Sequence, residues 1–248
     1  MASISLREVT VAYPVIVSGA QQSALAKAAR TLSFGRIGKG GDLTYVVALK
    51  QLSLDIGMGA RVGLIGRNGS GKSTLLRTLA GIVNPQSGLA RIDGSIGCLL
   101  NLYAGLDGDK SGYENLKLIG RLYGLQGREL TDAVEEAADF TELGPFLHLP
   151  ARTYSAGMTA RLSFAIATAR HAEIMLIDEV IGTGDAHFIG KAVERVKQLC
   201  DRSGIVVVAT HAPDILHGFC DEAILLDGGQ VAERGTVDDV WRAYAAAG

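Results

Sequence analysis

Two hydrophobic patterns alternate along the chain. Short runs of consecutive apolar residues, at 62–65, 174–178 and 204–209, predict buried strands. Between these runs, apolar residues recur three and four positions apart, which is typical of amphipathic helices. Because strands that alternate with helices form parallel sheets, the pattern predicts an α/β fold with a largely parallel sheet.

The first part of the chain follows a different pattern. Residues 3–13 alternate apolar and polar side chains and predict an edge strand, and residues 46–56 resume strand character. Residues 14–43 break the alternation with an Ala-rich stretch at 20–32, which a Gly-rich basic piece follows. Two interpretations of this insertion stay open. It is either a short surface helix with a loop, or a basic and apolar helix that lies at the membrane face or near a lipid phosphate.

The remaining regions are mostly helical. Helical spacing from about residue 112 to 149 predicts a helical insert between two α/β portions, within a helical subdomain at about 105–165. Within this region Ser155 is the predicted N-cap of a helix that reaches residue 170. The other predicted elements are a turn-rich passage at 81–94, a helix at 189–200, a hairpin around 227–229 and a closing helix from Val237.

A glycine-rich loop separates the strand at 62–65 from a helix that opens at Lys72. Its sequence, GRNGSGKS over residues 66–73, matches the pattern G-x-x-x-x-G-K-[ST] of a phosphate-binding loop. Glycines let the backbone curl so that N–H groups converge on phosphate oxygens, and the next helix offers more N–H groups and a positive dipole end. In such a loop Lys72 would reach the β- and γ-phosphates, and the Ser73 hydroxyl would bind Mg²⁺.

An acidic pair follows one of the buried strands. Asp178 and Glu179 come at the end of the apolar run that starts at residue 174. Alone, such a pair is more typical of a helix start, because acids favour the helix N-terminus. Together with Lys72 it indicates a Mg²⁺-nucleotide site, in which one carboxylate holds the metal and the next polarises the attacking water. Ligands of parallel sheets bind at the carboxyl ends of the strands, where the glycine-rich loop, Asp178 and His211 all fall.

Composition limits the function classes. The net charge of −2 gives no electrostatic case for nucleic acid as a partner. No apolar run approaches the ~18–20 residues needed to span a bilayer, and the N-terminus lacks the features of a signal peptide. Cys98, Cys200 and Cys220 are scattered without a C-x-x-C pair, so we expect reduced thiols in a cytoplasmic protein. Any membrane connection would then come through a partner or a surface contact.

The order of these motifs resembles the nucleotide-binding subunit of ATP-binding cassette (ABC) transporters. The phosphate-binding loop, the helical insert, the Y-S-A-G-M helix, IMLIDE and the T-H pair after a strand cover essentially the whole chain. The resemblance implies a P-loop NTPase fold of ABC type, with a mixed, largely parallel sheet, an antiparallel β portion and a helical subdomain. It also implies a single domain over residues 1–248 without a C-terminal carbohydrate-binding domain, and an ATPase that uses ATP and Mg²⁺.

The resemblance assigns a role to residues of each motif. Glu179 would be the general base and His211 would contact the γ-phosphate, while Ser73 and Asp178 would serve Mg²⁺. Asn101 would replace the glutamine that this family usually carries, and its amide oxygen can approach Mg²⁺ or water. The residues that would bind the phosphates are Gly66, Asn68, Gly69, Ser70, Gly71, Lys72, Ser73 and Thr74.

In that family the nucleotide is held between two copies of the domain. The signature residues that would face the ATP of the opposite copy are Ser155, Ala156, Gly157 and Met158. Asp185 resembles part of the family's dimer-contact loop. Tyr13 falls where an aromatic ring stacks on adenine, and Tyr45 is its rival because the insertion at 14–43 blurs the alignment.

Departures from the usual motifs point to one branch of the family. The usual signature is L-S-G-G-Q, and here it is Y-S-A-G-M-T-A-R-L. This segment, together with D-E-V-I-x-x-G-D-A-x-F, L-L-N-L-x-A-G and G-Y-E-N-L, resembles the branch that exports polysaccharides such as O-antigen, capsule and wall teichoic acid. The resemblance implies a homodimer that drives export of a lipid-linked polysaccharide through a separate transmembrane subunit, at the cytoplasmic face of the inner membrane. The alternatives are the ATPase of another ABC transporter, a non-transport ABC ATPase and a P-loop kinase.

Overall fold

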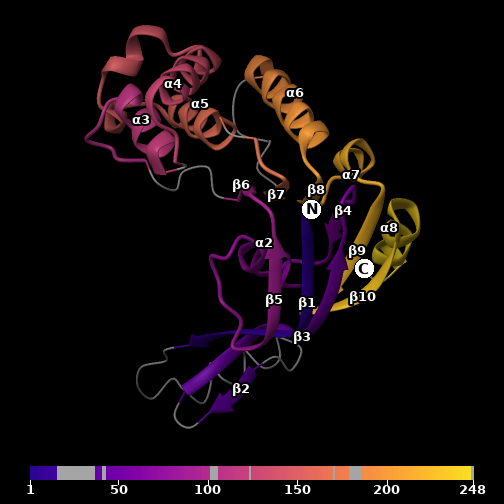
Figure 1. The fold of residues 1–248 in the computed structure, drawn as a ribbon. Helices are drawn as coiled ribbons and strands as arrows, with labels where there is room; N and C mark the ends of the chain where they lie inside the picture. Colours follow the sequence, from indigo (N-terminus) through magenta and orange to yellow (C-terminus); the bar gives the residue numbers. More distant parts are fainter. Residues whose placement is uncertain are drawn as a thin grey trace. The chain divides into compact units, whose positions relative to one another are not determined.

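The described chain forms two compact units. The computed structural model describes residues 1–15, 37–40, 43–100, 106–122, 124–169, 171–178 and 186–246. One unit comprises Met1–Gly94 and Gly204–Gly248, and the other comprises Ser95–Ser203 (Figure 1). The first unit carries the glycine-rich loop and most of the strands, and the second carries most of the helices.

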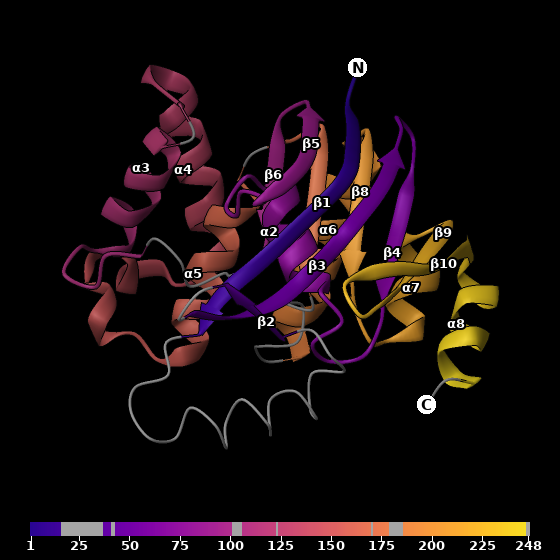
Figure 2. The ribbon, with the colours of Figure 1, turned by 90° about the horizontal axis from the view of Figure 1, so that it is seen from below.

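The first unit contains an antiparallel sheet with β1 in its interior. Its strands are β1 (Ser3–Val15), β2 (Ile37–Gly40), β3 (Leu43–Ile56) and β5 (Ser87–Asp93), in the order β2-β3-β1-β5. Figure 2 shows β1 between β3 and β5. The prediction of an edge strand for residues 3–13 is therefore wrong. The alternation indicates a strand with one buried and one exposed face. An interior strand has the same pattern when only one face of its sheet is covered, so the pattern does not distinguish it from an edge strand.

Strand β5 replaces much of the predicted turn-rich passage at 81–94. The Ser-Gly pair that suggested a turn lies inside the strand, where Gly88 has a φ of 85°. A Cβ at Gly88 would lie 2.4 Å from the carbonyl oxygen of Glu8, and the register of β1 and β5 shifts between Arg7 and Thr10. The glycine thus marks an irregularity of the strand pairing and not a chain reversal.

The same unit contains a parallel set of strands around β4 (Arg61–Ile65). Strand β4 pairs in parallel with β8 (Ile205–Ala209) on one side and with β9 (Glu222–Asp227) on the other. Strand β10 (Gln230–Thr236) pairs antiparallel with β9 and completes the predicted hairpin. Helices α7 (Pro213–Phe219) and α8 (Val237–Ala246) contact β4, and α2 (Lys72–Leu79) contacts β3, β5 and β8. Residues 62, 64 and 205–208 are almost completely buried, which explains their uninterrupted apolar sequence.

The second unit contains two parallel strands and the helical region. Strands β6 (Ile96–Leu99) and β7 (Ile174–Asp178) pair in parallel. The helices are α3 (Gly112–Leu122), α4 (Gly127–Thr141), α5 (Ala156–Ala167) and α6 (Ala186–Arg202), with short 3₁₀ turns η1 (Gly144–His148) and η2 (Ala151–Thr153). The predicted mixture of parallel strands, an antiparallel portion and a helical region is confirmed.

Part of the N-terminal insertion lies outside the described residues. The predicted helix at 20–32 lies in this part of the chain, so both of its interpretations remain predictions. The Gly-rich basic piece that follows was expected to be a loop, but its residues 37–40 form strand β2, which pairs antiparallel with β3. Among the helices that the structure describes, none is long and apolar enough to cross a membrane.

Candidate functional site

The glycine-rich loop of residues 66–73, called the phosphate loop below, packs closely against the strands around it. Gly66 has a φ of 152°, and a Cβ there would lie 2.4 Å from the carbonyl oxygen of Leu226 and 2.5 Å from Ser70 Oγ. Gly71 has a φ of 111°, and a Cβ there would lie 2.7 Å from the carbonyl oxygen of Ala48. Side chains at these two positions would push the loop away from its neighbours. The glycines of the motif are therefore required by packing as well as by backbone conformation.

Lys72 begins helix α2 and is only 8% exposed. Its Nζ donates hydrogen bonds to the carbonyl oxygens of Gly66 and Arg67, at 2.5 and 3.3 Å, so the ammonium group lies within the curl of the loop. The first turn of α2 contains no acidic residue, and no side chain in the described chain caps its N-terminus. A buried ammonium group and uncapped helix N–H groups create a positive potential that suits a phosphate.

The polar residues of the loop differ in exposure. Ser70 is 4% exposed, and its Oγ has no hydrogen-bond partner within the described part of the chain. Asn68, Gly69 and Ser73 are exposed, and Thr74 is half-buried. The loop thus offers hydroxyl groups and backbone N–H groups to a ligand, while its base is anchored in the core.

The hairpin turn between β9 and β10 contacts the phosphate loop. Gly229 lies in the turn between β9 and β10, its N–H donates to the carbonyl oxygen of Ser70 at 3.0 Å, and its carbonyl accepts from Lys50 N–H at 2.9 Å. A Cβ at Gly229 would lie 2.5 Å from the carbonyl oxygen of Ala48. The sequence pattern around 227–229 predicted the turn but not this contact, because nothing in the local pattern names a partner so distant in the chain.

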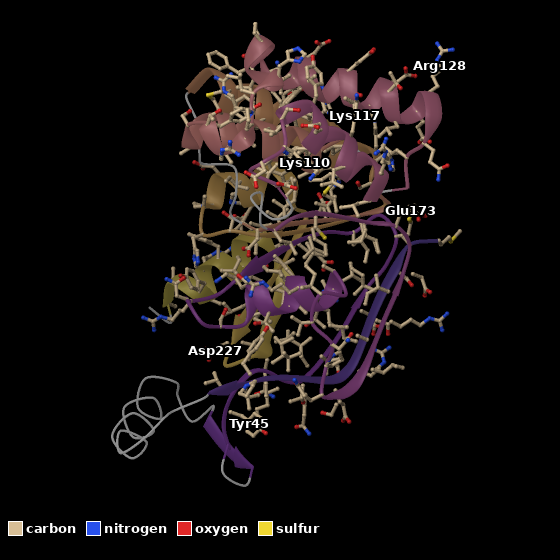
Figure 3. The ribbon with its side chains drawn as sticks, turned by 90° about the vertical axis from the view of Figure 1, so that its left-hand side faces the viewer. Tyr45, Lys110, Lys117, Arg128, Glu173 and Asp227 are labelled. Atoms are coloured by element: carbon tan, nitrogen blue, oxygen red, sulfur yellow. The ribbon has the colours of Figure 1, made fainter. Side chains whose placement is uncertain are left out.

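The pairing of β1 with β3 distinguishes Tyr13 from Tyr45. Tyr13 and Val11 are two positions apart on β1 and share a face of the ribbon, and Val11 pairs with Leu49. Leu49 Cδ2 lies 3.0 Å from the Cβ position of Gly71, so this face is the one against the phosphate loop. Tyr45 is adjacent to the residue that pairs with Tyr13, and it therefore points to the opposite face, away from α2 (Figure 3).

His211 follows β8 and lies in the same unit as the phosphate loop. Leu64 of β4 pairs with Ala209 of β8, so the loop and His211 leave the same edge of two neighbouring parallel strands. His211 is half-buried, and the preceding Thr210 is buried with its Oγ1 accepting from Ala212 N–H at 3.1 Å. Tyr13, the phosphate loop and His211 are the predicted site residues that this unit contains.

The second unit carries the signature residues. Ser155 caps α5, because its Oγ accepts a hydrogen bond from Met158 N–H at 3.3 Å, which confirms the predicted N-cap. Ser155, Ala156 and Gly157 are exposed, and a Cβ at Gly157 would meet only Ser155 Oγ within 4 Å, at 3.9 Å. The first turn of α5 therefore presents a hydroxyl group and a helix N-terminus at the surface of its unit.

Asp178 is half-buried at the end of β7, where its carboxylate follows the buried run of that strand. Asn101, Glu179 and Asp185 lie outside the described residues. Their predicted roles as metal ligand, general base and dimer contact stay predictions.

An aromatic and cationic cluster packs α5 against α4 and α6. The rings of Phe140, Phe164 and Phe188 contact one another with centroids 5.6 to 5.9 Å apart. Arg161 of α5 lies 4.9 Å from the Phe188 ring centroid, and Lys191 lies 4.8 Å from that of Phe140. Sequence reasoning missed this cluster, although an aromatic residue on each of three amphipathic helices is a signal for it.

Comparison with known proteins identifies the family. The family model described as "ABC transporter" matches residues 49–182. The O-antigen export system ATP-binding protein RfbE of Yersinia enterocolitica is 42% identical over 234 residues, which are 94% of this chain and 98% of that protein. RfbB of Myxococcus xanthus is 40% identical over 82% of this chain and 46% of its own length. The teichoic acids export ATP-binding protein TagH of Bacillus cereus is 36% identical over 83% of this chain and 37% of its own length.

Solved structures agree on the fold. A dimeric ATP-binding cassette in a post-hydrolysis state with ADP and Pi has a TM-score of 0.70 at 23% identity, and the match covers 94% of this chain and 98% of that one. An ATP-binding subunit of an ABC transporter has a TM-score of 0.71 at 21% identity, with 98% and 93% covered. The chain spans less than half the length of the RfbB and TagH relatives named above but nearly all of RfbE. The chain therefore belongs to the ABC transporter family, as an ATPase domain whose relatives are ATP-binding proteins of O-antigen and teichoic acid export systems.

Proposed function

We propose that this chain hydrolyses ATP to drive export of a lipid-linked polysaccharide through a separate transmembrane subunit. The observation that supports the export role is the 42% identity to an O-antigen export ATP-binding protein over 98% of that protein's length. The geometry of the phosphate loop supports the ATPase role, because its buried ammonium group and the helix N–H groups at the start of α2 suit a triphosphate.

The phosphate loop would hold the nucleotide by its phosphates. Lys72 would neutralise the β- and γ-phosphates, and backbone N–H groups of the loop would bind their oxygens. Tyr13 would stack on adenine, since its ring shares the ribbon face of Leu49, which packs against Gly71. His211 would contact the γ-phosphate from the neighbouring strand end.

The donor set of the chain suits Mg²⁺. The Ser73 hydroxyl is exposed on the first turn of α2, and Asp178 ends a strand. Mg²⁺ prefers oxygen ligands and is usually held by one or two protein groups together with substrate phosphates. When bound, Mg²⁺ would offset the charge that develops on the phosphates during transfer. Asn101 would approach the metal or its water, and Glu179 would take a proton from the attacking water.

A second copy of the chain would complete each site. The first turn of α5, Ser155 to Met158, would contact the γ-phosphate of ATP held by the opposite copy, and Asp185 would contact that copy. Closure around ATP and reopening after hydrolysis would form the two-state element that drives transport.

The membrane partner would dock on the helical region. Within the described residues, three large apolar side chains of this region are exposed, namely Leu122 at 72%, Phe146 at 53% and Leu149 at 46%. A contiguous apolar patch at a protein surface marks an interaction site, and these three side chains are the candidates for such a patch. The subunit would then lie at the cytoplasmic face of the inner membrane, bound through its transmembrane partner.

The test is the Glu179→Gln substitution in the full chain. We expect binding of ATP to be kept, while the rate of ATP hydrolysis falls by about 10²–10⁴-fold, which is the usual contribution of a general base. Cells that carry this variant should accumulate the lipid-linked polysaccharide without displaying it at the surface. Glu233→Gln, an exposed residue on β10, is the matched control and should behave as wild type.

Two results would contradict the proposal. Appreciable hydrolysis by the Glu179→Gln variant would assign the base elsewhere. Loss of hydrolysis with normal surface polysaccharide would keep the ATPase role and reject export of this substrate.

A further inference from the structure

The side chain of Gln86 pairs with the backbone of Ala12, one residue before Tyr13. Gln86 Oε1 accepts a hydrogen bond from Ala12 N–H at 2.6 Å, and Gln86 Nε2 donates one to the Ala12 carbonyl oxygen at 3.0 Å. The Gln86 backbone N–H also donates to the carbonyl oxygen of Thr10 at 2.9 Å. Gln86 thus contacts the backbone of Ala12 through its side-chain amide and the backbone of Thr10 through its own N–H.

The sequence around Gln86 explains why a side chain has this role. The pairing of β1 with β5 ends where Thr10 faces Ser87. Continued in the same antiparallel register, Ala12 would face Pro85, and proline has no N–H to donate to the Ala12 carbonyl. A glutamine amide carries a donor and an acceptor, as a peptide group does. The Gln86 amide therefore extends the strand pairing by one step that the backbone cannot make.

This extra step lies beside one of the irregular positions in the pairing of β1 with β3. The register between β1 and β3 shifts between Val11 and Ala12, so the ladder on the β3 side is irregular at this point. Along a strand, successive residues direct their backbone groups to opposite neighbours. The N–H and the carbonyl oxygen of Ala12 face Gln86, and without the Gln86 amide they would hydrogen-bond to water. The orientation of the next residue, Tyr13, depends on this peptide.

We propose that Gln86 is a positioning residue for the nucleotide base. By holding the Ala12 peptide, it fixes the direction in which the Tyr13 ring leaves β1 and keeps that ring ready to stack on adenine. The inference rests on the proposed role of Tyr13. Gln86 itself would touch neither the base nor the phosphates.

A double-mutant cycle in the full chain tests the inference. Binding of a non-hydrolysable ATP analogue and of tripolyphosphate is measured by calorimetry for wild type, Gln86→Ala, Tyr13→Ala and the double variant. Gln86→Ala should weaken binding of the ATP analogue by about three- to tenfold, a part of what base stacking contributes, and leave binding of tripolyphosphate unchanged. In the Tyr13→Ala background, Gln86→Ala should have no further effect, because there is no ring left to position.

The matched control is Gln51→Ala. Gln51 is exposed on β3 of the same sheet, and its side chain makes no hydrogen bond within the described ranges. Its substitution should change neither affinity. Gln86→Glu removes the donor and places a negative charge beside the Ala12 carbonyl, so it should weaken binding of the ATP analogue at least as much as Gln86→Ala.

The outcomes separate this inference from the proposed function. If Tyr13→Ala binds the ATP analogue as wild type does, the stacking role of Tyr13 is rejected and the inference falls with it. If Tyr13→Ala weakens binding but Gln86→Ala does not, only the inference is rejected. Gln86→Ala could also weaken binding of the ATP analogue and of tripolyphosphate equally, or its effect could add to that of Tyr13→Ala in the double variant. Either result would show that Gln86 has a general structural role and would overturn the inference.

Discussion

Asn115 is fully buried at the start of α3, and its amide is well provided with partners. Its Oδ1 accepts from Asp107 N–H at 2.8 Å, and its Nδ2 donates to the carbonyl oxygens of Asp107, Lys110 and Ser111. The side chain thus ties the loop before α3 to the helix. The asparagine of the G-Y-E-N-L segment is explained by this packing, because an unpaired amide at such a buried position would cost about 1–3 kcal/mol.

The thiol of Cys98 should react slowly with an alkylating reagent. Burial raises the pKa of the Cys98 thiol to about 11. At pH 8 only about 0.1% of this thiol would be ionised, compared with about a quarter for a free cysteine of pKa ~8.5. Because the thiolate is the nucleophile, we expect iodoacetamide to modify Cys98 at least about tenfold more slowly in the folded chain than in denaturant.

Mass spectrometry after timed quenching measures this rate. Since the pKa is raised, the rate should continue to increase above pH 9, where the rate of the denatured control levels off. A plateau near pH 9 in the folded chain would contradict the shift.

Among the elements of the fold, the turn between β9 and β10 helps to hold the phosphate loop in place. Gly228 and Gly229 have φ values of 59° and 77°, as a two-residue hairpin turn of type I′ requires. The turn contacts Ser70 and Lys50 through backbone hydrogen bonds, so it links the loop to β3. Backbone contacts of this kind hold the loop before any ligand arrives, and such preorganisation favours binding.

Gly229→Ala should therefore weaken nucleotide binding. Its Cβ would lie 2.5 Å from the Ala48 carbonyl oxygen, so the turn or the loop must move. We expect ATP affinity to fall by about tenfold or more, which corresponds to at least ~1.4 kcal/mol of binding free energy. Titration with a fluorescent ATP analogue measures the change.

Gly59→Ala is the control for backbone strain. Gly59 has a φ of 88°, but nothing lies within 4 Å of its Cβ position. This variant should lose about 1–2 kcal/mol of stability from the left-handed conformation, with unchanged ATP affinity. Equal ATP affinities for the two variants would show that strain alone, and not the contact with Ala48, explains any effect.

At the scale of the whole molecule, the predicted site residues are distributed over two units. The phosphate loop and His211 belong to one, and Asp178 and α5 belong to the other. The proposed sandwich of two copies would bring α5 of one copy to the phosphate loop of the other. In a symmetric dimer each residue then acts twice, once in each site.

Mixing two inactive variants tests this arrangement. Lys72→Ala removes the phosphate contact, and Gly157→Asp places a negative charge on the first turn of α5, so each variant alone should be inactive. In a mixed dimer one site would combine both defects and the other would be intact. We expect recovery of up to about a quarter of wild-type ATPase activity, because random pairing makes half of the dimers mixed and each carries one intact site.

The baseline for the mixing experiment is the ATPase activity of each variant alone and of wild type at the same protein concentrations.

Specific activity of wild type should also rise with protein concentration, since closed dimers form by mass action. No recovery on mixing would argue against a site formed by the phosphate loop of one copy and α5 of the other.

Features that depend on a few neighbouring residues could be predicted from the amino-acid sequence. The phosphate loop, the start of α2 at Lys72, the Ser155 cap and the 227–229 hairpin were all predictable, because glycine conformations, helix caps and turns are local. The buried strands were predictable because a core strand must be apolar on both faces. The order of the motifs was sufficient to indicate the ABC transporter family.

The contacts between distant segments became known from the fold. It placed β1 inside its sheet, turned residues 87–93 into a strand, and put Tyr13 and Tyr45 on opposite faces of one ribbon. It also brought Gly229 to Ser70 and Gln86 to Ala12. A strand's neighbours and register are set by contacts between residues far apart in the chain, and a local pattern of polar and apolar residues carries no record of the partner.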